Sequence, residues 1–286
     1  MYGEIEAMKN LFALFFLLFS SSLYCEQNLD YWRAEEYYCH SSSQKEAAGD
    51  LVQYVVIKGN EKILDVGCGD GKITAEIAAR IPNGSIIGID LSPAMIAFAT
   101  KEFSPHFPNL QFFLQDAQAL AFDSAFDIIF SFTTLQWVQQ HQAFLEGAYN
   151  SLKVDGILAV TMPMGLPEAL KQAAEELMVS PEWASYFYGF STGWNFVDEV
   201  QYKNMLVSNR FVPLRVAVVP QRDVFPSRDA FEQFISQWFP YLRPLPQDLK
   251  APFLKRVVDR FLELESSFPN QEVHFKIRRL EVIAAK

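Results

Sequence analysis

The sequence predicts an α/β fold in which a mostly parallel sheet carries helices on both of its faces. From about residue 62 to residue 162, apolar β-rich runs alternate with helical patterns, as parallel strands joined by crossover helices require. The first run leads into a turn with three glycines and then into a helix. Half of the 286 residues are apolar, so the chain can bury the core of one domain of this class.

The elements of the alternating part follow a helix-rich lead at about residues 28–58. Strands are predicted at residues 62–66, 85–89, 110–114, 126–131 and 157–162. Helices are predicted between them at residues 72–80, 93–103 and 143–152. The second of these helices has Ser92 as its N-cap and Pro93 in its first turn, which are favoured residues at those positions.

The alternation stops near residue 163. From there to about residue 206 the sequence is rich in aromatic residues with little strand pattern, so we expect a helical lid. A strand near residues 214–219, helices at 229–239 and 248–266, and a strand at 273–284 bring the number of strands to seven. The expected domain spans residues 26–286, with its core at about 44–162, the lid at about 163–206, and C-terminal strands and helices at 207–286.

Residues 1–25 form a separate signal-like or anchoring segment in this interpretation. Met8, Lys9 and Asn10 precede an apolar run at residues 11–19 and then a serine-rich stretch, an order typical of a secretory signal. The apolar run is too short for a comfortable transmembrane span. The pattern favours export, with a cytoplasmic or membrane-anchored location as the alternative.

The charge and the cysteines exclude several classes of partner. With a formal charge of −10 and a pI near 5.0, the chain lacks the basic face that nucleic acid binding needs. For the same reason we expect no bulk membrane binding beyond a possible N-terminal anchor. Cys25, Cys39 and Cys68 form no CxxC pair and have no histidine at metal-ligand spacing, so no metal site is predicted.

The turn after the first strand, Gly67-x-Gly69-x-Gly71, predicts a ligand site. Glycines let the backbone pass close to a ligand where a Cβ atom would collide, and the following helix directs its first amide groups toward that ligand. Asp90 ends the next strand, about 20 residues later, where an acidic side chain can bind both hydroxyls of a ribose. Together these residues indicate a ligand of the adenosine type.

The details of the loop decide between two such ligands. The dinucleotide fingerprint has two residues between its second and third glycines, whereas here a single residue separates Gly69 from Gly71. Asp65, ahead of the first glycine, would repel a pyrophosphate, but it suits the cationic amino and sulfonium groups of S-adenosyl-L-methionine. The loop therefore favours S-adenosyl-L-methionine as the cofactor.

Four segments resemble, in order, the motifs of class I S-adenosylmethionine-dependent methyltransferases. They are residues 63–74, 88–92, 115–117 and 126–131. The resemblance covers about residues 44–162. It implies a Rossmann-like fold with a mostly parallel seven-stranded sheet, and the activity of a methyltransferase.

The resemblance also implies which residues bind the cofactor. They stand at the ends of the first three strands: Asp65, Gly67, Gly69, Gly71, Asp90, Leu91, Asp116 and Ala117. Asp65 is expected to face the amino group, directly or through water, and Asp90 to hold the ribose. Leu91 is expected to pack on the adenine, and Asp116 and Ala117 to meet its edge.

A narrower resemblance concerns the substrate. Residues 38–44 and 131–138 are similar to segments of the trans-aconitate, malonyl-acyl-carrier-protein and juvenile hormone acid methyltransferases, which methylate carboxyl groups. It implies that Gln44 and Trp137 orient a substrate carboxylate through their amide and indole N–H groups. A carboxylate, whose pKa in water is about 4, is ionised at neutral pH and needs no general base. We expect a monomer that O-methylates a small molecule or an acyl carrier.

Two other functions stay open. His40 and His141 are candidates for a general base, which would allow methyl transfer to a carbon, a nitrogen or a phenol oxygen. A catalytically silent cofactor-binding protein is the second alternative. The aromatic lid suits a substrate with an apolar body, and it equally suits packing of the lid on the sheet.

Overall fold

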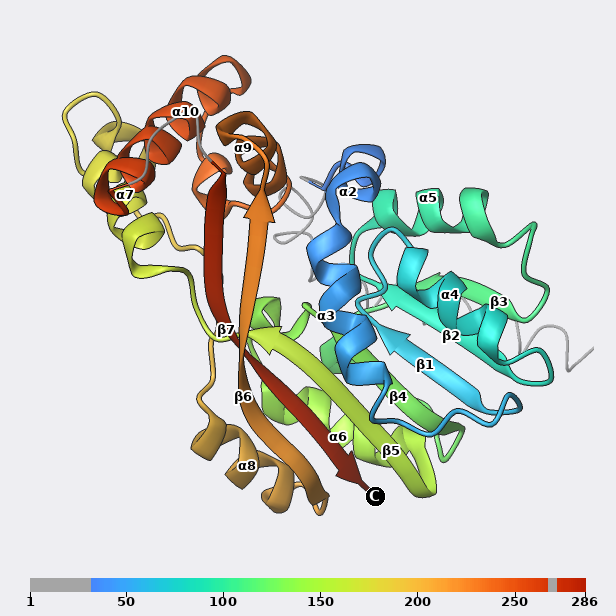
Figure 1. Ribbon diagram of the computed structural model, residues 1–286. Helices are drawn as coiled ribbons and strands as arrows, with labels where there is room; N and C mark the ends of the chain where they lie inside the picture. The colour runs from blue at the N-terminus through green and yellow to red at the C-terminus, as the bar shows by residue number, and fades with distance from the viewer. Residues whose placement is uncertain (1–31, 267–271) are drawn as a thin grey trace, which may run out of the picture. The chain divides into compact units, whose positions relative to one another are not determined.

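Seven strands form a sheet in the order β3-β2-β1-β4-β5-β7-β6 (Figure 1). The computed structural model describes residues 32–266 and 272–286, and the signal-like or anchoring segment expected at residues 1–25 lies outside them. Neighbouring strands from β3 to β5 are parallel, and β7 is antiparallel to β5 and β6. The strands are β1 (Lys62–Val66), β2 (Ser85–Asp90), β3 (Leu110–Leu114), β4 (Phe126–Phe132), β5 (Leu152–Pro163), β6 (Val212–Phe225) and β7 (Val273–Ala285). The predicted fold class is confirmed.

Helices cover both faces of the sheet because its central strands are apolar on both sides. Ile63 and Leu64, which are neighbours in β1, belong to two different apolar clusters, one on each face. One cluster contains side chains of α3 (Ser42–Val52), α4 (Lys72–Arg80) and α5 (Pro93–Phe103), and the other contains side chains of α6 (His141–Ser151) and α8 (Glu199–Ser208). Within the described ranges no helix is both long and apolar enough to cross a membrane.

The helix starts follow the local sequence. At α5 the Ser92 hydroxyl accepts a hydrogen bond from the Met95 N–H at 3.2 Å, with Pro93 in the first turn, as the sequence predicts. At α4 the preceding residue is Gly71, whose φ of 81° lies in the left-handed region that glycine adopts without strain. The other described helices on the sheet side of the chain are α2 (Ala34–His40), η1 (Ala117–Ala119) and η2 (Leu135–Trp137). The remaining helices, among them η3 (Ala184–Phe187), form the group described below.

The strands β6 and β7 extend beyond the rest of the sheet. β7 pairs with β5 only over residues 279–285, whereas it pairs with β6 as far as Val273 opposite Phe225. The outer part of the pair is therefore a two-stranded ribbon, which Figure 1 shows reaching toward α9 and α10. β6 is also longer than the strand expected at 214–219.

A group of helices, which we call the cap, packs on this ribbon. It comprises α7 (Glu168–Met178), η3, α9 (Arg228–Ser236), η4 (Pro240–Leu242) and α10 (Gln247–Leu264). Its core is aromatic: Phe231, Phe253 and Phe261 are buried, and Phe275 of β7 packs against them. The ribbon supplies the apolar surface that these amphipathic helices need.

The cap differs in its boundaries from the lid expected at residues 163–206. α8 falls within that range but packs on the sheet, where Tyr202 and Leu206 are fully buried. In turn α9 and α10, which belong to the C-terminal segment, complete the cap. An amphipathic pattern specifies that a helix buries one face, but not which surface covers that face.

The variant Tyr202→Phe tests the packing of α8 on the sheet. The Tyr202 hydroxyl is buried, and no group in the described part of the chain bonds to it, so its removal spares the desolvation of an unpaired polar group. We expect the free energy of unfolding to rise by about 1 kcal/mol. Tyr202→Ala should instead lower it by about 3–5 kcal/mol. Denaturant unfolding measures both values, and a loss of stability in Tyr202→Phe would contradict this packing.

Candidate active site

The glycine loop between β1 and α4 is tied to the end of β2. The N–H groups of Gly67 and Cys68 both donate to the Ile89 carbonyl, at 2.7 and 2.9 Å. A Cβ atom at Gly67 would overlap the Thr134 side chain, whereas one at Gly69 would meet only a ring carbon of Tyr37, at 3.9 Å. Gly67 therefore serves close packing inside the protein, whereas the space beside Gly69 is not filled by other residues of the described chain except for the edge of Tyr37.

Asp90 is held at the end of β2 by the same loop. Its Oδ2 accepts a hydrogen bond from the Gly69 N–H, and its Oδ1 accepts one from the Ser92 N–H, both at 2.9 Å. Burial raises the pKa of this carboxyl, and the backbone N–H groups oppose the rise. Its two oxygens offer about four acceptor positions, and the neighbouring N–H groups, that of Leu91 among them, do not fill all of them. The side chain can therefore still accept a hydrogen bond from a ribose hydroxyl.

Asp65 carries a buried oxygen that lacks a partner. The residue is 1% exposed, its Oδ2 accepts a hydrogen bond from the Thr74 hydroxyl at 2.6 Å, and its Oδ1 has no partner in the described part of the chain. Burial raises the pKa of Asp65 to about 7, and the charges of Asp90 and Asp70 add to the rise. A cationic ammonium group is the partner that such a carboxyl lacks. The residue fits the amino group of S-adenosylmethionine.

The remaining cofactor candidates gather at the same edge of the sheet. The Gln115 N–H donates to the Asp90 carbonyl at 3.0 Å, which brings the turn after β3 beside β2. There Asp116 caps η1, since its Oδ1 accepts a hydrogen bond from the Gln118 N–H at 2.8 Å, and Ala117 is partly buried. Leu91 is 43% exposed and free to cover a ring. The adenine contacts of these residues stay predictions.

The corner between α2 and α3 packs on the glycine loop, a contact that the sequence did not signal. The Ser41 hydroxyl donates to Oδ2 of Asp70 at 3.1 Å. The Lys72 ammonium donates to the Tyr38 carbonyl and lies 4.2 Å from the centre of the Tyr38 ring. These contacts place the first residues of α3, which include Gln44, beside the glycine loop.

A cavity lies beside Tyr37, whose ring is the neighbour of Gly69, and Gln44 and Trp137 both line it, whereas the glycines of the loop are not part of its wall. Its walls come from α3, from the ends of β4 and β5, from the β6–β7 ribbon and from the cap. Aromatic rings form much of the lining: Trp32, Tyr37, Trp137, Trp194, Phe234 and Trp238. Trp137 lies between the sheet and the cap. Its ring centre is 5.5 Å from that of Trp194 and 4.8 Å from the guanidinium carbon of Arg243.

Several polar atoms of the lining have no partner in the described part of the chain. They are Oε1 of Gln44, Oε1 of Gln136, Oγ1 of Thr161 and Nε1 of Trp238, and all four are buried. Buried polar atoms in native proteins are nearly always hydrogen-bonded. The cavity therefore suits a ligand that carries hydrogen-bonding groups as well as an apolar surface.

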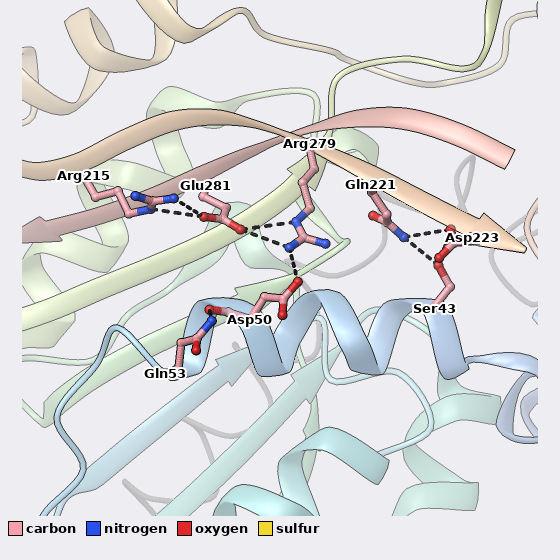
Figure 2. Close-up of polar contacts among 8 residues, drawn as sticks. All are labelled: Ser43, Asp50, Gln53, Arg215, Gln221, Asp223, Arg279 and Glu281. Atoms are coloured by element: carbon pink, nitrogen blue, oxygen red, sulfur yellow. Dashed lines mark hydrogen bonds and ion pairs between the residues drawn. The ribbon is translucent and has the colours of Figure 1, made fainter.

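Arg279 of β7 is the only residue with a full charge among those that line the cavity in the described chain. Figure 2 shows how it is held: Nε and Nη2 donate to Oε1 of Glu281 at 3.3 and 3.1 Å, and Nη2 donates to Oδ2 of Asp50 at 2.6 Å. Arg215 donates to the second oxygen of Glu281 at 2.7 Å. The Arg279 side chain is 7% exposed.

Sequence reasoning missed Arg279, Gln136 and Thr161. Arg279 and Glu281 stand two residues apart in a strand that is otherwise largely apolar, so they share one face of it. That spacing is the signal that could have found them, because charges buried on one strand face are usually paired. Gln136 and Thr161 carry no such signal.

The two histidine candidates do not meet the cavity. His141 is buried at the start of α6, with its ring centre 5.7 Å from that of Tyr202, and burial lowers its pKa. His40 ends α2 and is not part of the cavity wall. In the described residues no histidine, aspartate, glutamate or lysine lines the cavity, and no three His, Cys, Asp or Glu side chains form a metal cluster.

Known proteins resemble the chain over most of its length. A family model described as "Methyltransferase domain" matches residues 57–209, which is more than half of the chain. The trans-aconitate 2-methyltransferase of Methylobacterium radiotolerans is 29% identical over 78% of this chain and 86% of its own length. The enzyme of that name from an Acidovorax species is 27% identical over 89% of this chain and 98% of its own.

Solved structures share the fold. The YcgJ protein of Bacillus subtilis superimposes with a TM-score of 0.56 at 15% identity, covering 84% of this chain and 98% of that one. A Haemonchus contortus N-methyltransferase with S-adenosylhomocysteine bound has a TM-score of 0.54 at 17% identity, covering 84% of this chain and 52% of that one. Identities this low carry the fold alone. The family match indicates S-adenosylmethionine as the cofactor.

The pKa of Asp65 predicts how cofactor binding depends on pH. Because burial raises this pKa to about 7 in the free protein, the carboxyl is mostly neutral at pH 6 and becomes ionised as the pH rises. Only the ionised form pairs with the ammonium group. We therefore expect the affinity for S-adenosylmethionine to increase about tenfold from pH 6 to pH 7.5.

Calorimetric titration in two buffers of different ionisation enthalpy measures this effect, since binding at pH 6 should also release a proton. Asp65→Asn is the matched control and should bind weakly at both pH values. An affinity of the unmodified protein that is constant between pH 6 and pH 7.5 would contradict the pairing.

Proposed function

Since the chain belongs to the methyltransferase domain family and is a class I S-adenosylmethionine-dependent methyltransferase, we propose that it O-methylates a carboxylate of a small acid or an acyl carrier. In this reaction a carboxylate oxygen forms a bond to the methyl carbon while the bond from that carbon to sulfur breaks. The products are a methyl ester and S-adenosylhomocysteine. No proton is transferred.

The lack of a proton acceptor in the cavity carries this proposal. Among the described residues that line it, none is a histidine, aspartate, glutamate or lysine. An alcohol or a phenol is mostly protonated at neutral pH and needs such a base, whereas a carboxylate with a pKa of about 4 is already ionised. The lining thus suits a nucleophile that is already deprotonated when it binds.

Neutral donors are the second support. Gln44 presents an amide and Trp137 an indole N–H to the same cavity. Two neutral N–H groups can orient a carboxylate for in-line attack, and they withdraw less of its charge than a cation would. The aromatic rings of the lining would pack on the carbon skeleton of the acid. Trans-aconitate, which the relatives are named for, is one acid to test.

A panel of acids with methyl-labelled S-adenosylmethionine tests the proposal. We expect label to enter at least one carboxylic acid as an ester, which alkali converts to labelled methanol. Trans-aconitate, straight-chain fatty acids, aromatic acids and malonyl-acyl carrier protein form the panel, and amines and phenols of similar skeleton are the controls. Alkali-stable product from an amine or a phenol, with none from any acid, would refute carboxyl methylation.

Variants of Gln44 test the orienting role. Gln44→Met keeps the length of the side chain but removes the amide, so we expect kcat/KM for the acid to fall at least about tenfold, the value of one hydrogen bond to a charged group. Gln44→Glu adds a charge that repels the substrate and should cost more. Affinity for S-adenosylhomocysteine, measured by calorimetry, should stay within about twofold in both. Full activity of Gln44→Glu would contradict the role.

A further inference from the structure

The structure assigns Arg279 as a substrate-binding residue, which donates from Nη1 to a carboxylate oxygen of the substrate and so makes the cavity selective for acids. This inference rests on the proposed function, and it names a residue that the motifs do not mark. It concerns binding and selectivity, while the Gln44 and Trp137 side chains are left to orient the reacting group.

One of the three guanidinium nitrogens of Arg279, Nη1, makes no hydrogen bond within the described chain. Nε and Nη2 use their hydrogens on Glu281 and Asp50, whereas no residue of the described chain accepts a hydrogen bond from Nη1. The side chain, only 7% exposed, lines the cavity. Nη1 is not among the fully buried unpaired atoms, so its two N–H hydrogens are open to the cavity, where an acceptor from a ligand can reach them.

No carboxylate of the described chain accepts a hydrogen bond from Nη1 of Arg279. Asp223 is near enough for the charge of Arg279 to oppose the rise of its pKa, but no hydrogen bond joins the two in the described chain, and its Oδ2 accepts hydrogen bonds from the Ser43 hydroxyl at 2.8 Å and from the Gln221 amide at 2.9 Å. Figure 2 shows Ser43, Gln221 and Asp223 as a group of their own, separate from the contacts of Arg279, whose third nitrogen points to their side. The acceptor for Nη1 is thus expected from a ligand.

The surroundings of Arg279 hold it in one orientation. Glu281 is 3% exposed and bridges Arg279 and Arg215, and Asp50 of α3 binds Arg279 from the other side. A guanidinium fixed in this way loses little rotamer freedom when it binds a ligand. Glu281 and Asp50 balance the charge of Arg279, but they do not line the cavity, so Arg279 is the charged donor that the described lining offers to an acid.

Two carboxylates of a substrate could supply the acceptor. One is the carboxylate that receives the methyl group, and the other is a second carboxylate at the far end of a diacid. The chemistry at Nη1 is the same in both cases, so matched acids with one and two carboxylates distinguish them.

Calorimetric titration of protein saturated with S-adenosylhomocysteine tests the inference without relying on turnover. The probes are octanoate, octanedioate and trans-aconitate, with octanamide as the neutral probe. We expect Arg279→Gln to weaken binding of at least one acid about 10- to 100-fold, the effect of one hydrogen bond to a charged group, and to leave octanamide binding unchanged.

Arg215→Gln is the matched control, because it removes the same charge from the same Glu281 without touching the cavity wall. It should change acid binding by less than about threefold. Melting temperature and affinity for S-adenosylhomocysteine show whether each variant is folded. If Arg279→Gln proves unstable, Arg279→Lys, which keeps the charge but loses the fixed fork, should give an intermediate loss of acid binding.

Weaker octanoate binding identifies the reacting carboxylate, and weakening confined to octanedioate and trans-aconitate identifies a second one. Equal weakening in Arg215→Gln, unchanged binding in Arg279→Gln, or no binding of any acid to the unmodified protein would overturn the inference. Acid binding that depends on Arg279 with no ester formed in the labelled panel would support this inference and refute the proposed function.

Discussion

The hydrogen bonds between the glycine loop and the end of β2 are the contact on which the site depends. The Ile89 carbonyl accepts from two loop N–H groups, and the Asp90 carboxylate accepts from the Gly69 N–H. They hold the loop open above Gly69 and hold Asp90 beside it. Because β1 and β2 are parallel, both ends lie at one edge of the sheet, where ligands of such folds bind. The cofactor site therefore follows from strand direction and three short contacts.

The cavity that Gln44, Trp137 and Arg279 line depends on a different constraint, which is the length of the β6–β7 ribbon. The ribbon continues past β5, so its outer half needs an apolar cover, and the cap supplies it. A cavity is enclosed where the ribbon, the cap and α3 come together. At that point the ribbon meets α3 through Arg279, Glu281 and Asp50. Burying these charges is costly, and their mutual pairing offsets the cost.

Local patterns predicted the first half of the chain well. The expected bounds of α4, α5, β1 and β3 match the observed ones, because each element buries a face whose period is visible in the sequence. The glycine loop, Asp65 and Asp90 could be found in the sequence equally well, since the residues of a strand, a turn and the next helix are neighbours in sequence. The bounds of the lid were harder to predict, because α7 and α8 both bury one face but pack on different surfaces.

By itself the sequence determined the fold class and the methyl donor, and it predicted the residues around the donor, because these depend on contacts between successive elements. Only the tertiary structure showed that Gln44 and Trp137, which the sequence predicted, share a cavity with Arg279, which it did not predict. Gln44, Trp137 and Arg279 line one cavity because β7 is inserted between β5 and β6 and because α3 packs beside β7. Strand order and helix packing of this kind arise from long-range burial, which no local pattern of residues encodes.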